Sequence, residues 1–507
     1  MSGFQTKRAA EQYAGDQEAA IRANRYVDPR AGAITVQEWV NLWFPSLDLE
    51  PSTLSNYRYF IQSHILPAFG PRPLASLTYE EIAAWEKDLV QVHGYARRTA
   101  VDARATFATV LSDAVPGRIQ INPAAKKKAK GRKGVRRIAQ AAEKKKAWAD
   151  PLAAFLYAER CAALTGRWVD FVKQIAFVYT GARWSELLAL GPGSIKDGLL
   201  NLDTKLYELS GRFYTGHPKD GSIRVIDLPP FLVELLSTIE ARRCTCSPRE
   251  MGPGDPPWCE GGEYLFLGPD GGHPRRSTYG RRVVRPAADG WHPARGNKGA
   301  MPVLADVFNG WPGALVAPWP AAVKGQPYEA PRLAELSRGH KTLPSSTPIA
   351  TWLPVARELT VHGLRHSHQT WMAEDRIADV LRDKRMGHTV EDDARIASLM
   401  RDHYTHVSEQ MRAELIAALE RRWVKSLVDR VDLEERWNAE GIPRRSSAPG
   451  VDDLLRPYRE SRATKIGSPL APKSGHRRQR KRPLPDWETA SEQQVGDTGI
   501  EPVTSSV

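Results

Sequence analysis

The sequence predicts a mainly α-helical chain with a small antiparallel β-sheet, which is the α+β class. Apolar residues recur at helical spacing through residues 35–123, again through 153–179, and from His362 onward. Residues 199–229 instead alternate in places and carry glycine turns, one of them at Asp220-Gly221, which is typical of short antiparallel strands. A length of 507 residues with 41% hydrophobic residues is sufficient for two or three domains.

Residues 1–33 are polar and are expected to be helical in part. Residues 35–123 read as a small all-helical domain of four helices. The first covers the apolar run from Val36, and the second follows Pro51, with Ser52 or Thr53 as its cap. The third begins at Thr78 with the pattern of a capping box, and the fourth runs from about 98 to 115.

Residues 124–149 form a basic linker. Between Lys126 and Lys146 the chain carries eleven basic side chains and one acid, Glu143. Such a block repels itself and stays extended, so it is either a solvated linker or a segment that lies along DNA phosphates and displaces their counterions. In the second case, the residues that contact phosphates are Lys126, Lys127, Lys128, Lys130, Arg132, Lys133, Arg136 and Arg137.

Residues 150–423 are predicted to form a larger mixed domain. Within it, residues 243–350 are rich in Gly, Pro and Trp and poorly periodic, which indicates an insertion. Residues 424–507 are predicted to be a largely disordered tail. The helix expected over 408–423 has an apolar face that either packs on the domain's own core or docks on a neighbouring subunit. This face consists of Met411, Leu415, Ile416, Leu419 and Trp423.

The net charge indicates the class of partner, and the missing membrane and secretory signals indicate the compartment. A net charge of +13 and a pI near 9.5 favour a polyanion such as nucleic acid. No apolar run approaches the ~18 residues that a membrane span needs, and the N-terminus lacks the apolar core of a secretory signal. Four cysteines do not suggest a disulfide framework. We therefore expect a cytoplasmic, nucleoid-associated protein with no membrane partner.

Three short segments carry side chains suited to chemistry on an anion. Arg183 follows a glycine turn at a helix start, where free N–H groups also attract anions, and Glu186 lies one turn on and can orient the guanidinium. His362 and Arg365 are spaced to share one helix face, and histidine passes protons near neutral pH. The third segment contains His388 and, further on, Tyr404. Taken singly, each could be a surface pair, a structural histidine or an exposed tyrosine.

Taken in chain order, these segments resemble the tyrosine recombinase, or phage integrase, family. The family pattern reads T-G-x-R-x-x-E-L, then H-x-x-R, then L-G-H and Y-x-H. The resemblance implies a helical SAM-like core-binding domain at 35–123, a catalytic domain at 150–423, and a remnant of an arm-type DNA-binding module at 1–33. Met386 stands where the family usually has Leu. The segment between His388 and Tyr404 exceeds the compact family spacing, which leaves open whether the tyrosine acts within its own subunit.

The resemblance also implies a mechanism. Tyr404 would attack a DNA phosphorus and form a 3′-phosphotyrosine, while Arg183 and Arg365 stabilise the developing charge. His362 would accept the phenol proton, and His388 would hydrogen-bond the phosphate. The family's catalytic lysine stands on a β-turn, and Lys219 occupies the corresponding turn, with Arg224 and Lys205 as rivals. No cofactor is required for catalysis. The expected partners are double-stranded DNA attachment sites, further copies of the chain in a homotetramer, and an accessory excision or bending factor.

Several functions fit these observations. The first is site-specific recombination that integrates or excises a phage or an integrative element. A non-catalytic DNA-binding regulator on the same fold is an alternative, as are a chromosome or plasmid dimer resolvase and a type IB topoisomerase. Degraded catalytic residues would favour the regulator, and none are seen in the sequence.

The cysteines suggest a separate site. Cys244, Cys246 and Cys259 form a C-x-C-x12-C pattern, and His273 or His292 could supply a fourth ligand. A structural zinc would stabilise a segment rich in Gly and Pro that has little core of its own. The alternative is a set of reduced thiols.

Overall fold

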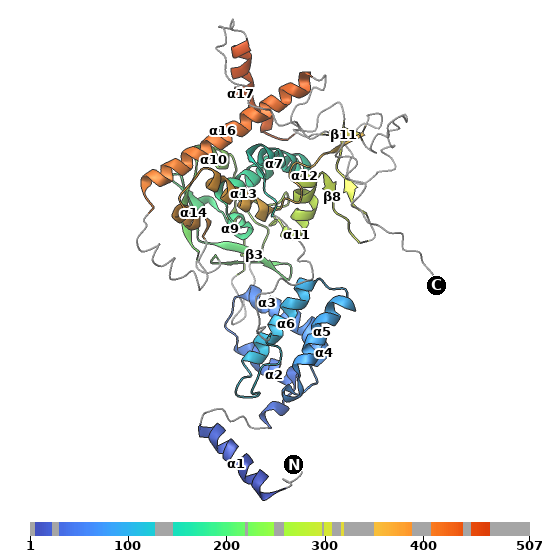
Figure 1. Cartoon of the computed structure of the whole chain (residues 1–507). Coiled ribbons are helices and arrows are strands. Elements are labelled where there is room, and N and C mark those ends of the chain that lie inside the picture. The colour runs from blue at the N-terminus through green and yellow to red at the C-terminus, as the bar shows by residue number, and fades with distance from the viewer. Residues whose placement is uncertain are drawn as a thin grey trace, which may run out of the picture. The chain divides into compact units, whose positions relative to one another are not determined.

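The computed structural model describes residues 6–22, 30–126, 146–218, 222–247, 258–296, 299–306, 316–318, 349–387, 407–439 and 448–466. The chain divides into two compact units, residues 1–142 and 143–507, which are described separately below (Figure 1). The boundary between them falls within the predicted basic linker.

The smaller unit is all-helical, as the sequence predicts. It contains α1 (Lys7–Arg22), α2 (Val36–Trp43), α3 (Pro51–Phe60), α4 (Leu66–Phe69), α5 (Tyr79–Gln91) and α6 (Arg97–Ser112). A single π-helical turn, Ile61–Ile65, joins α3 to α4. The core gathers apolar side chains from α2 to α6, among them Val36, Ile65, Ile82 and Phe107.

The helix starts of this unit follow local capping chemistry. The predicted capping box is present: the Thr78 hydroxyl accepts from the Glu81 N–H at 3.3 Å, and a Glu81 carboxylate oxygen accepts from the Thr78 N–H at 3.2 Å. An equivalent box at Thr35 and Glu38 starts α2. The expected cap of α3 is wrong by two or three residues, because Glu50 is the N-cap and Pro51 takes the first helical position, where proline needs no N–H partner.

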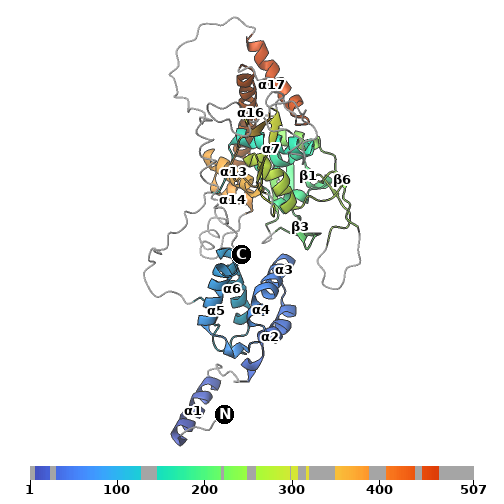
Figure 2. The ribbon, with the colours of Figure 1, turned by 90° about the vertical axis from the view of Figure 1, so that its right-hand side faces the viewer.

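The larger unit is built on helices α7 (Pro151–Thr165) and α8 (Trp168–Thr180), close to the predicted bounds. Helix α13 (Val361–Glu374) packs on α8, and α16 (Glu409–Ala439) packs along α7 (Figures 1 and 2). The side chains between these helices are almost wholly buried aromatic and aliphatic groups, including Phe155, Phe171 and Trp371. Two shorter helices, α9 (Trp184–Leu188) and α14 (Asp379–Met386), border the same core.

The predicted antiparallel sheet consists of two separate pieces. Strands β1 (Ile195–Lys196), β2 (Leu199–Leu202) and β5 (Arg224–Asp227) form one sheet in the order β1-β2-β5, while β3 (Lys205–Leu209) and β4 (Arg212–Gly216) form a hairpin. The hairpin turns at Ser210-Gly211, where both residues have positive φ. The expected turn at Asp220-Gly221 lies outside the described residues. Helix α10 (Pro230–Ser237) follows β5.

Short elements fill the region between α10 and α13. Strands β6 (Arg242–Arg243) and β7 (Glu263–Tyr264) pair with each other, as do β8 (Trp291–His292) and β9 (Met301–Pro302). Strands β10 (Leu304–Asp306), β11 (Val316–Pro318) and β12 (Ile349–Trp352) form a sheet in the order β10-β12-β11. Between β7 and β8, α11 (Arg276–Tyr279), a π-helical turn (Gly280–Val284) and α12 (Arg285–Asp289) succeed one another.

Residues 258–289, which the sequence analysis assigns to an insertion, are packed into the main core. Phe266, Tyr279 and Val284 belong to the main core, and the Tyr279 hydroxyl donates to buried Asp170 at 2.8 Å. The Arg160 guanidinium, from the centre of α7, donates to the Ala287 carbonyl at 3.1 Å. The π-turn interrupts the helical period here, so the pattern of apolar residues gave no sign of a core segment.

The prediction of a disordered tail from 424 is wrong for two stretches. Helix α16 continues to Ala439, and α17 (Val451–Ile466) packs against it. Buried Arg430 donates to both carboxylate oxygens of Glu159 in α7, at 2.9 and 3.0 Å, so the charged composition of α16 conceals an internal ion pair. Residues 440–447 and 467–507 lie outside the described part of the chain.

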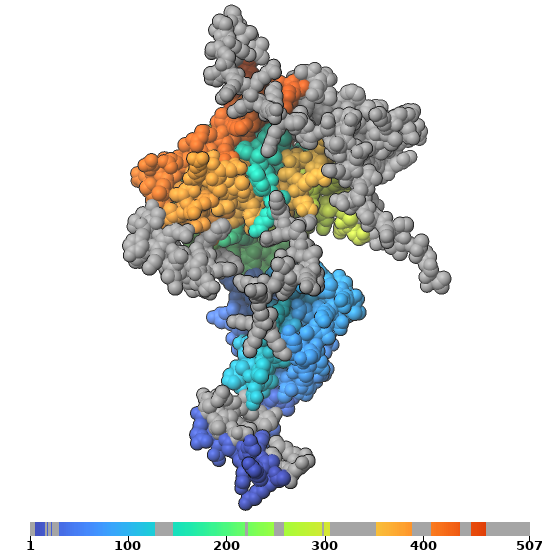
Figure 3. Space-filling model, viewed as in Figure 1, coloured from blue at the N-terminus to red at the C-terminus, as the bar shows by residue number. Residues whose placement is uncertain are grey.

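The apolar face of α16 packs on the chain's own core. Leu415, Leu419 and Trp423 are buried, and the Trp423 ring stacks on Phe231 with centroids 4.6 Å apart. Arg422 pairs with Asp375 and Glu374 at the end of α13. Figure 3 shows the segment that contains α13 and α14 beside α16 at the surface. The elements together confirm the predicted fold class. Among the described residues, no helix combines the length and the apolar character that crossing a membrane requires.

Candidate functional site

The turn between α8 and α9 positions Arg183. Helix α8 ends at Gly181, which has φ 67°, and Arg183 is the N-cap of α9. A side chain at position 181 would meet His368 and Met386 atoms 2.8 Å from its Cβ, so the close approach of α13 and α14 requires glycine. The Thr-Gly-x-Arg sequence therefore brings the arginine to the junction of three helices.

Arg183 makes three side-chain hydrogen bonds that hold its guanidinium in one orientation. It donates to Glu186 Oε1 at 2.7 Å, to the Ser222 hydroxyl at 3.0 Å and to the Gly387 carbonyl at 3.0 Å. The pairing with Glu186 agrees with the sequence prediction. About 29% of the Arg183 side chain is exposed, so the guanidinium can still reach a ligand.

Arg365 lies beside Arg183 and is buried. It donates to the Gly181 carbonyl at 2.5 Å and to the Met386 carbonyl, the residues that end α8 and α14. Burial, together with repulsion from Arg183 and Arg224, lowers the pKa of Arg365 to about 10. The guanidinium therefore stays charged at neutral pH. Among the described residues, no carboxylate lies within ion-pair distance of it.

Arg224 is a third guanidinium at this site. The sequence identified it only as a rival for the lysine role, but it is buried and pairs with Glu186 at 2.8 and 3.2 Å. It also donates to the Arg385 carbonyl at 2.8 Å. Burial raises the pKa of Glu186, but the bonds from Arg224 and Arg183 outweigh that effect and bring the pKa down to about 2. Glu186 is therefore ionised and is shared by two arginines.

His362 lies one helical turn before Arg365 on α13, as the i, i+3 spacing predicts. It lines the same cavity as Arg183, and its ring meets that of His366 edge to face with centroids 4.7 Å apart. Desolvation, together with repulsion from His366 and Arg365, lowers the pKa of His362 to about 4. The imidazole is therefore neutral at pH 7 and is a weak base.

The cavity between these groups is large and basic. Its volume is about 940 Å³, and Arg276, Arg281 and Arg285 line it together with Arg183 and His362. Sequence reasoning missed these three arginines because it assigned their segment to an insertion. The run RRSTYGRRVVR, with basic residues at nearly helical spacing, is the signal that could have identified them.

Three predicted catalytic residues, Lys219, His388 and Tyr404, lie outside the described residues. Two of them have neighbours in the chain that belong to the site. His388 directly follows Gly387, whose carbonyl accepts from Arg183, and Lys219 precedes Ser222, whose hydroxyl accepts from Arg183. The rival Lys205 starts β3, with its ammonium 5.2 Å from the Tyr207 ring centroid.

Of the predicted DNA contacts, only Lys126 lies within the described residues. It is exposed, with its ammonium 3.4 Å from Glu86 Oε1. The other seven, Lys127 to Arg137, lie outside them.

The predicted metal ligands come together in the larger unit. The ligand atoms of Cys244, Cys246, Cys259 and His273 all lie within 4.8 Å of one another. His273 takes the fourth place, whereas His292 lies in β8 and is not part of the cluster.

One family model matches the sequence within its helical domain. Residues 35–90 match the family model described as the phage integrase N-terminal SAM-like domain. The integrases of Mycobacterium phages FRAT1 and D29 are each 32% identical to the chain over 92 residues, which is 18% of this chain. The matched part spans 28% and 25% of the length of these two relatives.

Solved integrase structures align with most of the chain at low similarity. The Tn1549 transposon integrase in complex with a circular intermediate DNA covers 74% of this chain and 97% of its own, with 14% identity and a TM-score of 0.44. A lambda integrase tetramer bound to a Holliday junction covers 81% and 91%, with 17% identity and a TM-score of 0.41. The family match and the two phage relatives confirm the resemblance that the motifs indicate: residues 35–90 match the phage integrase N-terminal SAM-like domain, and the chain is similar to phage integrases.

Proposed function

We propose that this protein catalyses site-specific DNA recombination, in which strands at attachment sites are cut and rejoined to integrate or excise a phage or an integrative element. One observation supports this most directly. Arg183 and Arg224 pair with the single carboxylate of Glu186, and the buried guanidinium of Arg365 lies beside them without an ion pair among the described residues. A basic cavity that Arg183 and His362 line adjoins this group.

This charge balance favours an anionic ligand. Buried charge is costly unless it is paired, and here one carboxylate faces three cations. A DNA phosphodiester supplies the missing negative charge, and arginine suits it because its planar fork can donate two parallel hydrogen bonds. Arg276, Arg281 and Arg285 extend the positive surface along which a DNA backbone could continue.

The proposed reaction conserves a phosphodiester bond. The Tyr404 oxygen attacks phosphorus and passes its proton to the neutral imidazole of His362, while Arg183 and Arg365 stabilise the added negative charge. The bond to the 5′ oxygen breaks, Lys219 donates a proton to that oxygen, and a 3′-phosphotyrosine forms. His388 hydrogen-bonds the phosphate. A 5′ hydroxyl from a partner strand reverses these steps, so the reaction needs no cofactor and no external energy.

The wider assembly is also part of the proposal. The basic segment from Lys126 to Arg137 contacts phosphates, four copies of the chain act on two duplexes, and an accessory excision or bending factor sets the direction. Such a protein would work at the nucleoid. A non-catalytic regulator on the same fold is the second candidate, since it would use the same basic surface without the chemistry.

The test is covalent trapping on a nicked suicide substrate made from DNA that adjoins the coding sequence. The wild-type chain should form a protein–DNA adduct that survives denaturation, and Tyr404→Phe should not. Tyr59→Phe, at an exposed tyrosine of the smaller unit, is the matched control and should trap DNA like the wild type. An adduct with Tyr404→Phe would disprove the assignment of the nucleophile. Tight DNA binding without any wild-type adduct would support the regulator.

A further inference from the structure

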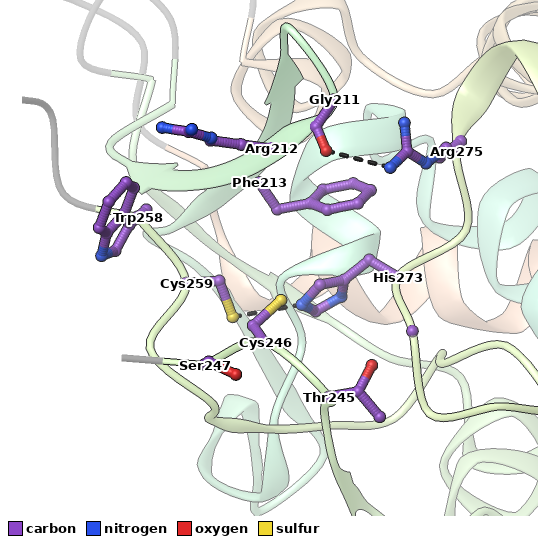
Figure 4. A pocket seen from close by; sticks show the side chains of 11 residues that line it. Gly211, Arg212, Phe213, Thr245, Cys246, Ser247, Trp258, Cys259, His273 and Arg275 are labelled. Atoms are coloured by element: carbon purple, nitrogen blue, oxygen red, sulfur yellow. Dashed lines mark hydrogen bonds between the residues drawn. The ribbon is translucent and has the colours of Figure 1, made fainter. Parts of the chain in front are cut away.

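We propose that Cys244, Cys246, Cys259 and His273 bind one structural zinc ion. The four side chains come from three separate segments of the larger unit, and their ligand atoms all lie within 4.8 Å of one another. Figure 4 shows Cys246, Cys259 and His273 directed toward a common point. Three thiolates and one imidazole are a ligand set that structural zinc sites use.

The distances fit a tetrahedral ion. Zinc–sulfur and zinc–nitrogen bonds near 2.3 and 2.0 Å place the ligand atoms of a tetrahedron about 3.5–3.8 Å apart. The Cys259 sulfur lies 3.3 Å from the Cys244 sulfur and 3.2 Å from His273 Nε2. These values are a few tenths of an ångström short of the tetrahedral spacing, so small side-chain movements would admit the ion at the centre.

The backbone holds the three ligand segments together. The Cys259 N–H donates to the Phe213 carbonyl of β4 at 3.0 Å, and the Cys244 N–H donates to the Gly262 carbonyl at 3.0 Å. The Thr245 N–H donates to the Gly271 carbonyl at 3.1 Å, which ties the C-x-C segment to the loop that carries His273. Backbone hydrogen bonds therefore hold the ligand segments together in part, so zinc binding has to order less of the chain.

The surroundings suit thiolates that bind a metal. Cys244, Cys259 and His273 are each less than 8% exposed. The Tyr264 hydroxyl lies 3.3 Å from the Cys259 sulfur, where it can donate to a thiolate and orient it. A cavity of about 370 Å³, lined by Cys246, Cys259 and His273, provides an entry path for the ion.

The position of the cluster suggests what the ion stabilises. The Phe213 ring lies 4.9 Å from the His273 ring and also lines the large cavity with Arg183 and His362. Arg275, two residues after His273, donates to Glu208 at 2.8 Å and to the Gly211 carbonyl at 3.0 Å. Zinc would therefore fix the β3–β4 hairpin that forms one wall of the cavity, and this consequence rests on the proposed function.

Metal content of the full-length chain tests the proposal without DNA. Protein purified under reducing conditions and dialysed should retain one zinc ion per chain. Cys246→Ser, at the most exposed of the ligands, should lose it. Cys161→Ser is the matched control, because this cysteine is buried in α7 away from the cluster, and it should keep the metal. Retention of zinc by Cys246→Ser, or its absence from the wild type, would overturn the proposal.

Two further measurements remain informative if a ligand variant does not fold. Tyr264→Phe removes only a hydroxyl and should weaken zinc binding about tenfold, as loss of an outer hydrogen bond typically does. Cobalt(II) in place of zinc should give the intense visible bands of a tetrahedral site and a sulfur-to-cobalt charge-transfer band. Weak bands typical of octahedral cobalt would contradict the proposal. It would also be contradicted if Cys244 and Cys259 oxidised to a disulfide as readily with zinc present as without it.

The outcomes for zinc and for recombination are separable. Zinc-loaded protein that traps no DNA would contradict the proposed function alone. Protein freed of zinc that still forms the adduct at the wild-type rate would contradict the role of the ion in the hairpin wall, even if the chain binds zinc.

Discussion

Replacing Glu186 by Gln is predicted to destabilise the larger unit strongly. The bonds from Arg224 and Arg183 bring the pKa of Glu186 from 4.5 to about 2. A shift of that size corresponds to roughly 3 kcal/mol of stabilisation, at 1.4 kcal/mol per pH unit. Because the side chain is only about 1% exposed, solvent screens this interaction little, and the glutamine amide would leave Arg183 and Arg224 without their carboxylate partner.

The assay is urea unfolding followed by tryptophan fluorescence and circular dichroism. Glu374→Gln is the matched control, because Glu374 also accepts from an arginine, Arg422 at 3.0 Å, but its side chain is 47% exposed. We expect a loss of about 3 kcal/mol for Glu186→Gln and less than about 1 kcal/mol for the control. Sulfate should restore more stability to Glu186→Gln than to the wild type, since the anion would occupy the vacated charge position.

The pH dependence gives a second, independent check on Glu186. Its pKa in the folded chain lies below its ordinary value, so the ionised form stabilises the fold fully above about pH 4.5. This contribution is lost as the pH falls toward 2. The stability difference between wild type and Glu186→Gln should therefore shrink over that interval. Equal costs for the two glutamine variants at pH 7, or a difference that does not change with pH, would refute the reasoning.

Three further predictions concern the arginine, the long helix and the glycine turn. Arg183→Lys should lower the rate of adduct formation by about 10²–10³-fold, because an ammonium cannot keep all three bonds of the guanidinium. DNA binding at low salt should change little. Rates near wild type in single-turnover trapping would contradict this prediction. Glu159→Gln leaves Arg430 buried with a lost partner and should cost about 3–5 kcal/mol in urea unfolding, whereas an unchanged midpoint would show that α16 is not part of the core. Gly181→Ala should lower the free energy of unfolding by more than about 1 kcal/mol. Gly193→Ala is the control and should not, because a Cβ at this position meets no atom within 4 Å and the backbone has an ordinary φ. Similar melting temperatures for the two variants would disprove the close approach at Gly181.

The sequence could predict the parts of the site that local patterns encode. Arg183 and Glu186 share a helix start, and His362 and Arg365 share one helix face, so spacing alone places each pair. The capping box at Thr78 was predictable for the same reason. Each of these features involves residues that are within four positions of one another in the chain.

Features formed between distant segments could not be read in this way. Arg224 reaches Glu186 from a strand 38 residues further along the chain, and no pattern links the two. Arg430 and Glu159 are 271 residues apart and fully buried, so a charged helix that looks solvated is in fact part of the core. The π-turn at Gly280–Val284 hid a core segment because it disturbs the helical period on which prediction relies. In each case a contact between residues far apart in the chain determines a structural feature that composition and local spacing do not predict.

The positive charge of the site has a consequence for the timing of the proposed reaction. Desolvation and the nearby cations, Arg365 among them, hold the pKa of His362 near 4, so the free imidazole is a weak base. A bound phosphodiester would neutralise part of that charge and raise the pKa toward its ordinary value. We therefore expect His362 to become an effective proton acceptor only when DNA occupies the cavity. In the proposed reaction, the arginines that bind the substrate would then also keep His362 inactive in its absence, and the phenol of Tyr404 would lose no proton before DNA is bound.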